Sequence, residues 1–217
     1  MRNKLTTIAL QEEAAAFARE ESAYAEPLIF GVTDGKAIGT YLELKFRKYL
    51  KERYDFAEGN AAKGIDFPDI DVDMKVTSIK QPQSSCPYKS ARQKVFGLGY
   101  SVLVFIYEKS DDHERKTGNL NILHVVFIER DRTGDYQATR NIRQIIETGG
   151  NAEDIIAYMT DRNFPIDDIQ AQAIAQEALK KRPEQGYLTI SNALQWRLQY
   201  GRAIQEAGSV SGVIRII

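Results

Sequence analysis

The chain has 217 residues, of which 43% are hydrophobic and 10% aromatic, and its 29 Lys and Arg nearly balance its 30 Asp and Glu. This composition predicts a folded globular protein, built as one domain or as a core with an appended subdomain, and it excludes a disordered chain. The formal net charge of −1 excludes a generally basic nucleic-acid coat, so any DNA contact must use local basic patches.

The single cysteine, Cys86, excludes an internal disulfide and, by itself, a zinc site. We therefore expect a cytoplasmic protein. The first residues lack the apolar stretch of a signal peptide, and no window approaches the ~18 continuous apolar residues of a membrane span. No membrane partner is expected.

Two helices are predicted in the first quarter of the chain. Residues 8–24 are rich in Ala and Glu, which favours helix, and residues 37–54 place Ile38, Leu42 and Phe46 on one face. Glu43 lies beside that apolar stripe, so its side chain is expected at the edge of the buried face.

Three strands are predicted next. Apolar and polar residues alternate over 71–77, and the apolar runs 100–107 and 120–128 are typical of central strands covered on both faces. The segments between them are expected to be a polar loop at 79–89, a short helix at 89–98 and a solvated turn region at 109–119.

Helical patterns dominate the rest of the chain, at 137–147, 151–161, 167–181 and 191–207, and the tail 210–217 is predicted to form a last short strand. The order of elements predicts an α/β (α+β) fold with a central mixed sheet flanked by helices. We expect a division into a core with N-terminal helices, 1–135, and a mostly helical C-terminal portion, 136–217, packed on that core.

Chemistry-bearing residues gather around the first predicted strand. Asp73 and Lys75 are two apart, so they project from the same face, and charges near a core must be paired or bind a metal. The turn sequence 67–70, with Pro at its second position, would fold Asp66 back towards Asp73. Asp69 would lie ~13 Å from Asp73 along a strand, and Asp71 reaches it only if both side chains lean together. Whether either joins the site stays open.

Two carboxylates and a lysine suit hydrolysis of a phosphodiester. Mg²⁺ prefers oxygen ligands and keeps several waters, so one or two carboxylates suffice to bind it. The ion stabilises charge on a phosphoryl oxygen and lowers the pKa of a bound water, and a lysine can orient that water or balance the phosphate charge.

The spacing of Asp66 to Asp73-Met74-Lys75 resembles the PD-(D/E)XK nuclease motif, in the form found in the mismatch-repair nicking endonuclease and its restriction-enzyme relatives. The segment 39–43 is similar to the helix whose glutamate joins the metal site of many members. The resemblance covers roughly residues 37–128 and implies a restriction-endonuclease-like core, with Asp66, Asp73 and Glu43 as ligands of Mg²⁺ and Lys75 as the residue that positions the attacking water. This sequence departs from the common pattern in carrying Asp73 where Glu is commoner, and in having Pro68-Asp69 too near Asp73 to supply the first ligand.

DNA contacts are predicted for the loop and helix that follow the first strand. Lys and Arg neutralise phosphates, whereas Arg, Gln and Ser read base edges. The predicted DNA-binding residues are Lys80, Gln81, Gln83, Ser84, Ser85, Lys89, Arg92 and Gln93. The helix predicted at 191–207 is interpreted either as a recognition helix, with Gln195, Arg197, Gln199 and Arg202, or as a dimer contact. The C-terminal portion is therefore expected to contribute to DNA binding or dimerisation.

The preferred hypothesis, which rests on the resemblance and on size, is a type II restriction endonuclease that cleaves double-stranded DNA at a short specific sequence. A homodimer is expected, because the symmetry of a protein mirrors that of a palindromic site. The alternatives are a nicking or structure-specific repair nuclease with the same centre, and a non-catalytic DNA-binding or interaction protein with an inert acidic face. A calcium loop beginning at Asp69 is excluded, because its sixth and twelfth positions hold Met74 and Lys80 instead of Gly and Glu.

Overall fold

Two long helices open the chain in a computed structural model that describes residues 2–59, 64–87, 89–193 and 195–217. They are α1 (Thr7–Ser22) and α2 (Gly35–Lys51), which confirms both predicted helices. Each begins at a side-chain cap, because Thr6 accepts a hydrogen bond from the backbone N–H of Ala9 and Asp34 accepts one from Lys36. The short strands β1 (Asn3–Lys4) and β3 (Tyr54–Asp55) pair beside them, and a 3-10 turn, η1 (Pro27–Ile29), precedes α2.

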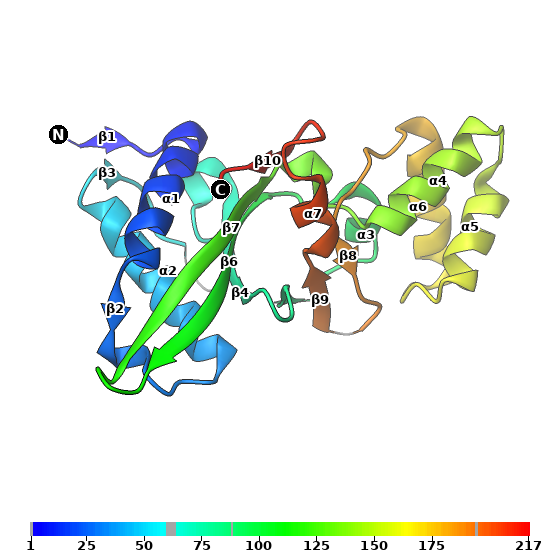
Figure 1. Cartoon of the computed structure of the whole chain (residues 1–217). Helices are drawn as coiled ribbons and strands as arrows, with labels where there is room; N and C mark the ends of the chain where they lie inside the picture. Colours follow the sequence, from blue (N-terminus) through cyan, green and yellow to red (C-terminus); the bar gives the residue numbers. More distant parts are fainter. Residues whose placement is uncertain (1, 60–63, 88, 194) are drawn as a thin grey trace.

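The central sheet is mixed, as predicted, with the strand order β10–β7–β6–β4 (Figure 1). Strands β4 (Val72–Ser78) and β6 (Ser101–Asp112) are parallel, whereas β7 (Thr117–Ile128) is antiparallel to β6 and to β10 (Val213–Arg215). The short β2 (Ala25–Glu26) also pairs with β7. Strand β10 confirms the strand predicted in the tail.

The segment predicted as a solvated turn, 109–119, is mostly strand. Pairing between β6 and β7 continues as far as Asp112 and Thr117, so only the four residues between them form the turn. The prediction was wrong because this end of the hairpin extends beyond the core, and backbone pairing there needs no apolar side chains.

Strand β6 is buried on both faces, which explains its unbroken apolar run. Leu103 and Phe105 pack with α1 and α2 in one hydrophobic core, whereas Val102, Val104 and Ile106 belong to a second core on the other face. Strand β4 at the edge of the sheet places Val72 and Met74 in the first of these cores.

The second core is closed by a three-stranded sheet with the order β5–β9–β8, formed by β5 (Gln83–Pro87), β9 (Gln195–Gln199) and β8 (Thr189–Ile190). The polar loop predicted at 79–89 and the helix predicted at 191–207 are therefore wrong in these stretches. Of the described residues in 191–207, only those of α7 (Gly201–Glu206) are helical. Buried Trp196 and Leu198 alternate with exposed Arg197 and Gln199, which is the period of a strand.

Helices α4 (Tyr136–Glu147), α5 (Ala152–Asp161) and α6 (Asp168–Lys180) confirm the predicted helices and lie at the end of the molecule opposite α1 (Figure 1). They share a third core with the short α3 (Arg92–Phe96). Because the chain then adds β8, β9 and β10, the segment 136–217 is not only helical, and its last strand is hydrogen-bonded into the central sheet. Among the described residues, no helix is long and apolar enough to cross a membrane.

Because residues 195–199 form a strand, alanine substitutions at adjacent positions should have very different effects on the free energy of unfolding. Leu198→Ala should lower the free energy of unfolding by about 2–5 kcal/mol, because this side chain is fully buried. Gln199→Ala should change it by less than about 0.5 kcal/mol, because the residue is exposed. Urea unfolding followed by the fluorescence of the single tryptophan, Trp196, measures both, and equal losses would contradict the alternation.

Candidate active site

The chain reverses direction immediately before β4. The backbone N–H of Phe67 donates to the carbonyl of Val72 at 2.9 Å, and Val72 donates back to Phe67 at 3.2 Å. A 3-10 turn, η2 (Pro68–Ile70), and a left-handed Asp71 with φ of 51° lie between them. Pro68 suits the first turn position, because its φ is already fixed there, and Asp tolerates the left-handed region better than most residues. The predicted reversal at 67–70 is confirmed.

The reversal lays Asp66 alongside β4. One carboxylate oxygen of Asp66, Oδ2, accepts a hydrogen bond of 2.8 Å from the backbone N–H of Met74. The other, Oδ1, is paired with the guanidinium of Arg47 from α2. Asp66 is therefore fixed at both oxygens, beside the residue that separates Asp73 from Lys75.

Asp73 and Lys75 form an ion pair on the same face of β4, with 2.7 Å between Asp73 Oδ2 and Lys75 Nζ. The Asp73 side chain is 4% exposed and that of Lys75 is 22% exposed. The lysine is therefore partly exposed to solvent, whereas the aspartate is buried.

Burial and crowding shift the protonation equilibria of this pair. Burial raises the pKa of Asp73 to about 7, opposed by Lys75 and reinforced by the neighbouring Asp66. Burial alone would lower the pKa of Lys75, but the surrounding carboxylates, Asp73 first among them, raise it above its usual range. The lysine therefore stays charged, and Asp73 lacks full compensation for its negative charge.

Glu43 approaches the same group from α2. It is partly buried, and burial followed by the charge of Asp66 raises its pKa, whereas Lys75 and Arg47 lower it. It also lines a cleft of about 350 Å³ together with Lys75. Nevertheless, no three acidic, His or Cys side chains within the described ranges lie close enough together to hold one metal ion. The structure thus brings Asp66 and Asp73 together, with Glu43 in their electrostatic neighbourhood.

Arg47 is a member of this group that the sequence analysis missed. It follows Glu43 by four residues on α2, so the two side chains share one face of the helix. That spacing is a signal that could have identified it, since Glu43 was already a candidate.

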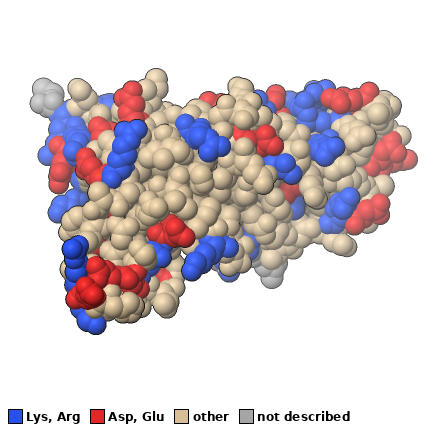
Figure 2. All heavy atoms as spheres, in the orientation of Figure 1, with Lys and Arg blue, Asp and Glu red and all other residues tan. Residues whose placement is uncertain are grey.

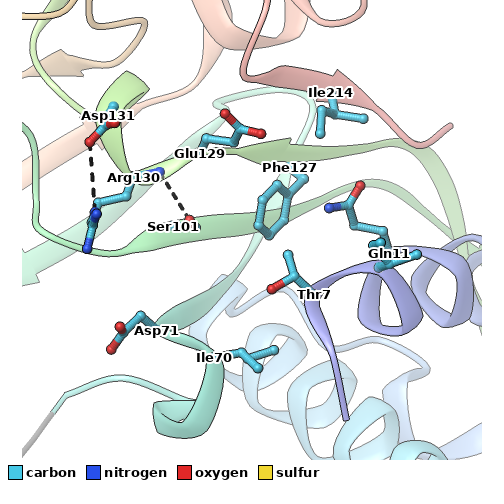
Figure 3. Close-up of a pocket in the computed structure, with 11 residues that line it drawn as sticks. Thr7, Gln11, Ile70, Asp71, Ser101, Phe127, Glu129, Arg130, Asp131 and Ile214 are labelled. Carbon is cyan, nitrogen blue, oxygen red and sulfur yellow. Dashed lines mark hydrogen bonds and ion pairs between the residues drawn. The ribbon is translucent and has the colours of Figure 1, made fainter.

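The two alternative acids lie elsewhere. Asp69 accepts a hydrogen bond of 2.8 Å from the backbone N–H of Ala57 and is exposed. Asp71 lines a separate cavity of about 570 Å³ at the start of β4 and β6, where it lies apart from the labelled Glu129 and Arg130 (Figure 3). That cavity is larger than the cleft, but it contains none of the four predicted catalytic residues.

The predicted DNA-binding residues separate into two groups. Gln83, Ser84 and Ser85 lie on β5 and line the cleft that holds Glu43 and Lys75. Lys80, Gln81 and Lys89 are exposed on the connections that flank β5.

Arg92 and Gln93 on α3 are engaged away from that cleft. Arg92 pairs with Glu177 of α6, and the side-chain amide of Gln93 donates to the carbonyl of Leu98 at 3.1 Å. Their predicted role in DNA contact gains no support from these positions. Arg197, which the sequence analysis placed on a possible recognition helix, also lines the cleft, as does Lys36, which was not predicted.

The donor set suits a hard divalent cation. Three carboxylates, Asp66, Asp73 and Glu43, lie near two cations, Lys75 and Arg47, and burial raises the pKa of both Asp73 and Glu43. Carboxylate oxygens are the ligands that Mg²⁺ prefers, and two of them with waters complete its shell. Asp66 and Asp73 therefore fit such an ion, with Lys75 beside them to contact a phosphate or a water.

Charge over the rest of the visible face is dispersed. Figure 2 shows basic and acidic side chains interspersed along the molecule, with no broad surface of one sign. This agrees with the near-neutral composition.

Comparison with known proteins identifies the family. The model of the type II restriction enzyme NspV family matches residues 4–215. The chain is 59% identical over 212 residues to the type II restriction enzyme NspV of Nostoc sp. (strain ATCC 29411 / PCC 7524), covering 98% of this chain and 96% of that protein. No solved structure matches. The chain therefore belongs to the NspV family of type II restriction enzymes.

Proposed function

We propose that this chain hydrolyses phosphodiester bonds of double-stranded DNA at a short specific sequence, with Mg²⁺ held by Asp66 and Asp73 and with Lys75 facing the reacting phosphate. Membership of the NspV family makes the chain a DNA endonuclease. The observation that carries the assignment of the centre is the convergence of Asp66, Asp73 and Lys75 around the reversal at 67–72.

The metal ion would lie at the carboxylates of Asp66 and Asp73. Type II restriction enzymes generally use a divalent metal ion, and an oxygen-only donor set favours Mg²⁺ over softer metals. When bound, the ion would stabilise charge on the phosphate and lower the pKa of a water. Glu43 lines the cleft and would hold a water of the ion's shell rather than bind it directly.

In this proposal Lys75 contacts the phosphate or the attacking water. Its ammonium is charged, partly exposed and fixed by Asp73. A fixed cation at this position stabilises the negative charge that develops on the phosphate oxygens and can orient a water by hydrogen bonding. Arg47 would act one step further back, by holding the Asp66 carboxylate in place.

We also infer that the centre is of the PD-(D/E)XK type. The order of the elements supports this assignment, because a glutamate-bearing helix, a reversal with the first acid, and a strand with the second acid and the lysine follow one another along the chain. Asp73 in place of the commoner Glu shortens the reach of the second acid by one methylene, and the reversal at 67–72 compensates by bringing Asp66 directly against β4.

Lys75→Ala should reduce the rate of plasmid cleavage in Mg²⁺ by about 100-fold or more, because it removes the fixed cation from the phosphate. Supercoiled plasmid and agarose gels measure the rate, with Lys180→Ala, an exposed lysine on α6, as the matched control. The wild type should yield linear fragments, since we propose a homodimer that cuts both strands of a palindrome. Normal cleavage by Lys75→Ala would refute the centre, and nicked circles as the final product would favour a nicking enzyme instead.

Asp66→Asn should weaken Mg²⁺ binding by at least about tenfold, because an amide is a poorer and uncharged ligand. Isothermal titration calorimetry without DNA measures the affinity directly. Asp71→Asn serves as the control, because Asp71 is exposed and lies in the other cavity, and Asn accepts its left-handed backbone. Equal affinities of both variants and the wild type would exclude Asp66 as a ligand.

Mg²⁺ affinity should increase as the pH rises from 6 to 8. The pKa of Asp73 is raised to about 7, so at pH 6 most molecules carry the neutral carboxyl, and a proton must leave before the ion binds. The affinity should therefore fall by up to about tenfold per pH unit below 7 and level off above it. The same calorimetric titration at several pH values tests this, and a flat profile would contradict a buried, protonated Asp73.

A further inference from the structure

We propose that the outer face of the ribbon formed by β5 and β9, two neighbouring strands of the three-stranded sheet, reads base edges in the DNA major groove, through Gln83, Ser85, Arg197 and Gln199. This inference rests on the proposed function and extends it by naming a surface that selects the sequence to be cut. It also replaces the recognition helix that the sequence predicted at 191–207 with a pair of strands.

The four side chains belong to one face of the ribbon. Strands β5 and β9 are antiparallel, with Gln83 opposite Gln199 and Ser85 opposite Arg197. Directly opposite residues project to the same side, and residues two apart on one strand do so as well. Arg197, Gln199 and Ser85 are exposed, and Gln83 is partly exposed.

None of these four side chains is hydrogen-bonded or ion-paired to another residue within the part of the chain that the structure describes. Their backbones, in contrast, are firmly held. The N–H of Arg197 donates to the hydroxyl of Ser191 at 2.9 Å, and the N–H of Ser191 donates to the carbonyl of Arg197 at 3.1 Å. The face therefore has side-chain donors and acceptors that are available to a ligand, on a backbone that is held by hydrogen bonds.

The opposite face of the ribbon anchors it to the protein. Trp196 and Leu198 are fully buried in the second core, and the Ser84 hydroxyl lies 2.5 Å from the hydroxyl of buried Tyr200. A ribbon fixed in this way loses little conformational freedom when it binds, which favours precise recognition.

The ribbon stands next to the proposed centre. Gln83, Ser85 and Arg197 line the same cleft as Glu43 and Lys75. A duplex whose phosphate lies at Lys75 would therefore place its neighbouring base pairs against the ribbon. The major groove, which is ~12 Å wide, admits a pair of β-strands. The third strand, β8, pairs with β9 only at Thr189 and Ile190, opposite Gln199 and Leu198, so the part of the ribbon around Ser85 and Arg197 has two strands.

The residue types favour base reading over simple attraction to phosphates. Arg forms two hydrogen bonds with guanine O6 and N7, Gln forms two with adenine N6 and N7, and Ser can serve either base. Only one of the four side chains is charged, so the face can neutralise little of the DNA backbone. Hydrogen-bond recognition is what such a face can supply.

Arg197→Ala and Arg197→Lys test this inference. The recognised sequence is first mapped by sequencing the ends of wild-type plasmid fragments. Binding is then measured by fluorescence anisotropy, with Ca²⁺ replacing Mg²⁺, on a duplex that carries the mapped sequence and on a duplex of equal length with that sequence scrambled. Arg115→Ala, whose side chain is 80% exposed in the β6–β7 turn, is the matched control, and melting temperatures verify folding.

Arg197→Ala should bind the mapped duplex about 10- to 100-fold more weakly and the scrambled duplex with unchanged affinity, and lysine should not restore the loss. Cut-site sequencing of this variant should show relaxed selection at one base pair. If Arg197→Ala lost equal affinity for both duplexes and Arg197→Lys restored it, Arg197 would contact a phosphate, and base reading would be overturned. If Arg197→Ala lost affinity for neither duplex, Arg197 would not contact the DNA. In both of these cases wild-type cleavage through Lys75 would stand; if the wild type cut no DNA, the proposed function itself would fail.

Discussion

Two carboxylates held against each other at the edge of a hydrophobic core are the constraint on which this active site depends. The reversal before β4 places Asp66 on the backbone of Met74, and β4 places Asp73 inside the protein. Like charges in a poorly solvated place repel, so the arrangement persists only with compensating cations. Arg47 and Lys75 supply part of that compensation, and in the function proposed above a divalent metal ion supplies the rest.

The position of β4 in the sheet makes this arrangement possible. As the edge strand of the central sheet it packs Val72 and Met74 in the core that contains α2. Its other face carries Asp73 and Lys75, of which Lys75 lines the cleft. The inner part of the middle strand β6, residues 102–107, is buried and apolar on both faces and carries no charge. Asp73 and Lys75 are therefore carried by a strand of the central sheet. Residues of β5 and β9 also line the cleft.

Features encoded over short stretches were predictable from sequence, and features that depend on distant pairing were not. The reversal follows from local turn chemistry around Pro68, and α2 from its 3.6-residue period, so the approach of Asp66 to Asp73 could be anticipated. Strand β5 is polar and is paired with residues more than a hundred positions later, so its own sequence resembles a loop. For β9 the alternation of Trp196 and Leu198 with polar residues was visible, but the good helix formers around it favoured the wrong period. Arg47 was missed because a basic residue on a helix is usually solvated.

The distribution of charge separates cleavage from recognition. The acidic side chains of the centre repel DNA phosphates, and the whole chain has a net charge of −1, so electrostatic attraction to DNA of arbitrary sequence is weak. A bound divalent ion reverses the sign of the local charge at the point where a phosphate must approach. If the ribbon reads bases as proposed above, affinity comes mainly from hydrogen bonds that only the correct bases can make, because mismatched bases would leave polar groups of the ribbon unpaired and desolvated. A nearly neutral protein with an acidic centre is thus well suited to bind one sequence strongly and DNA of other sequences weakly.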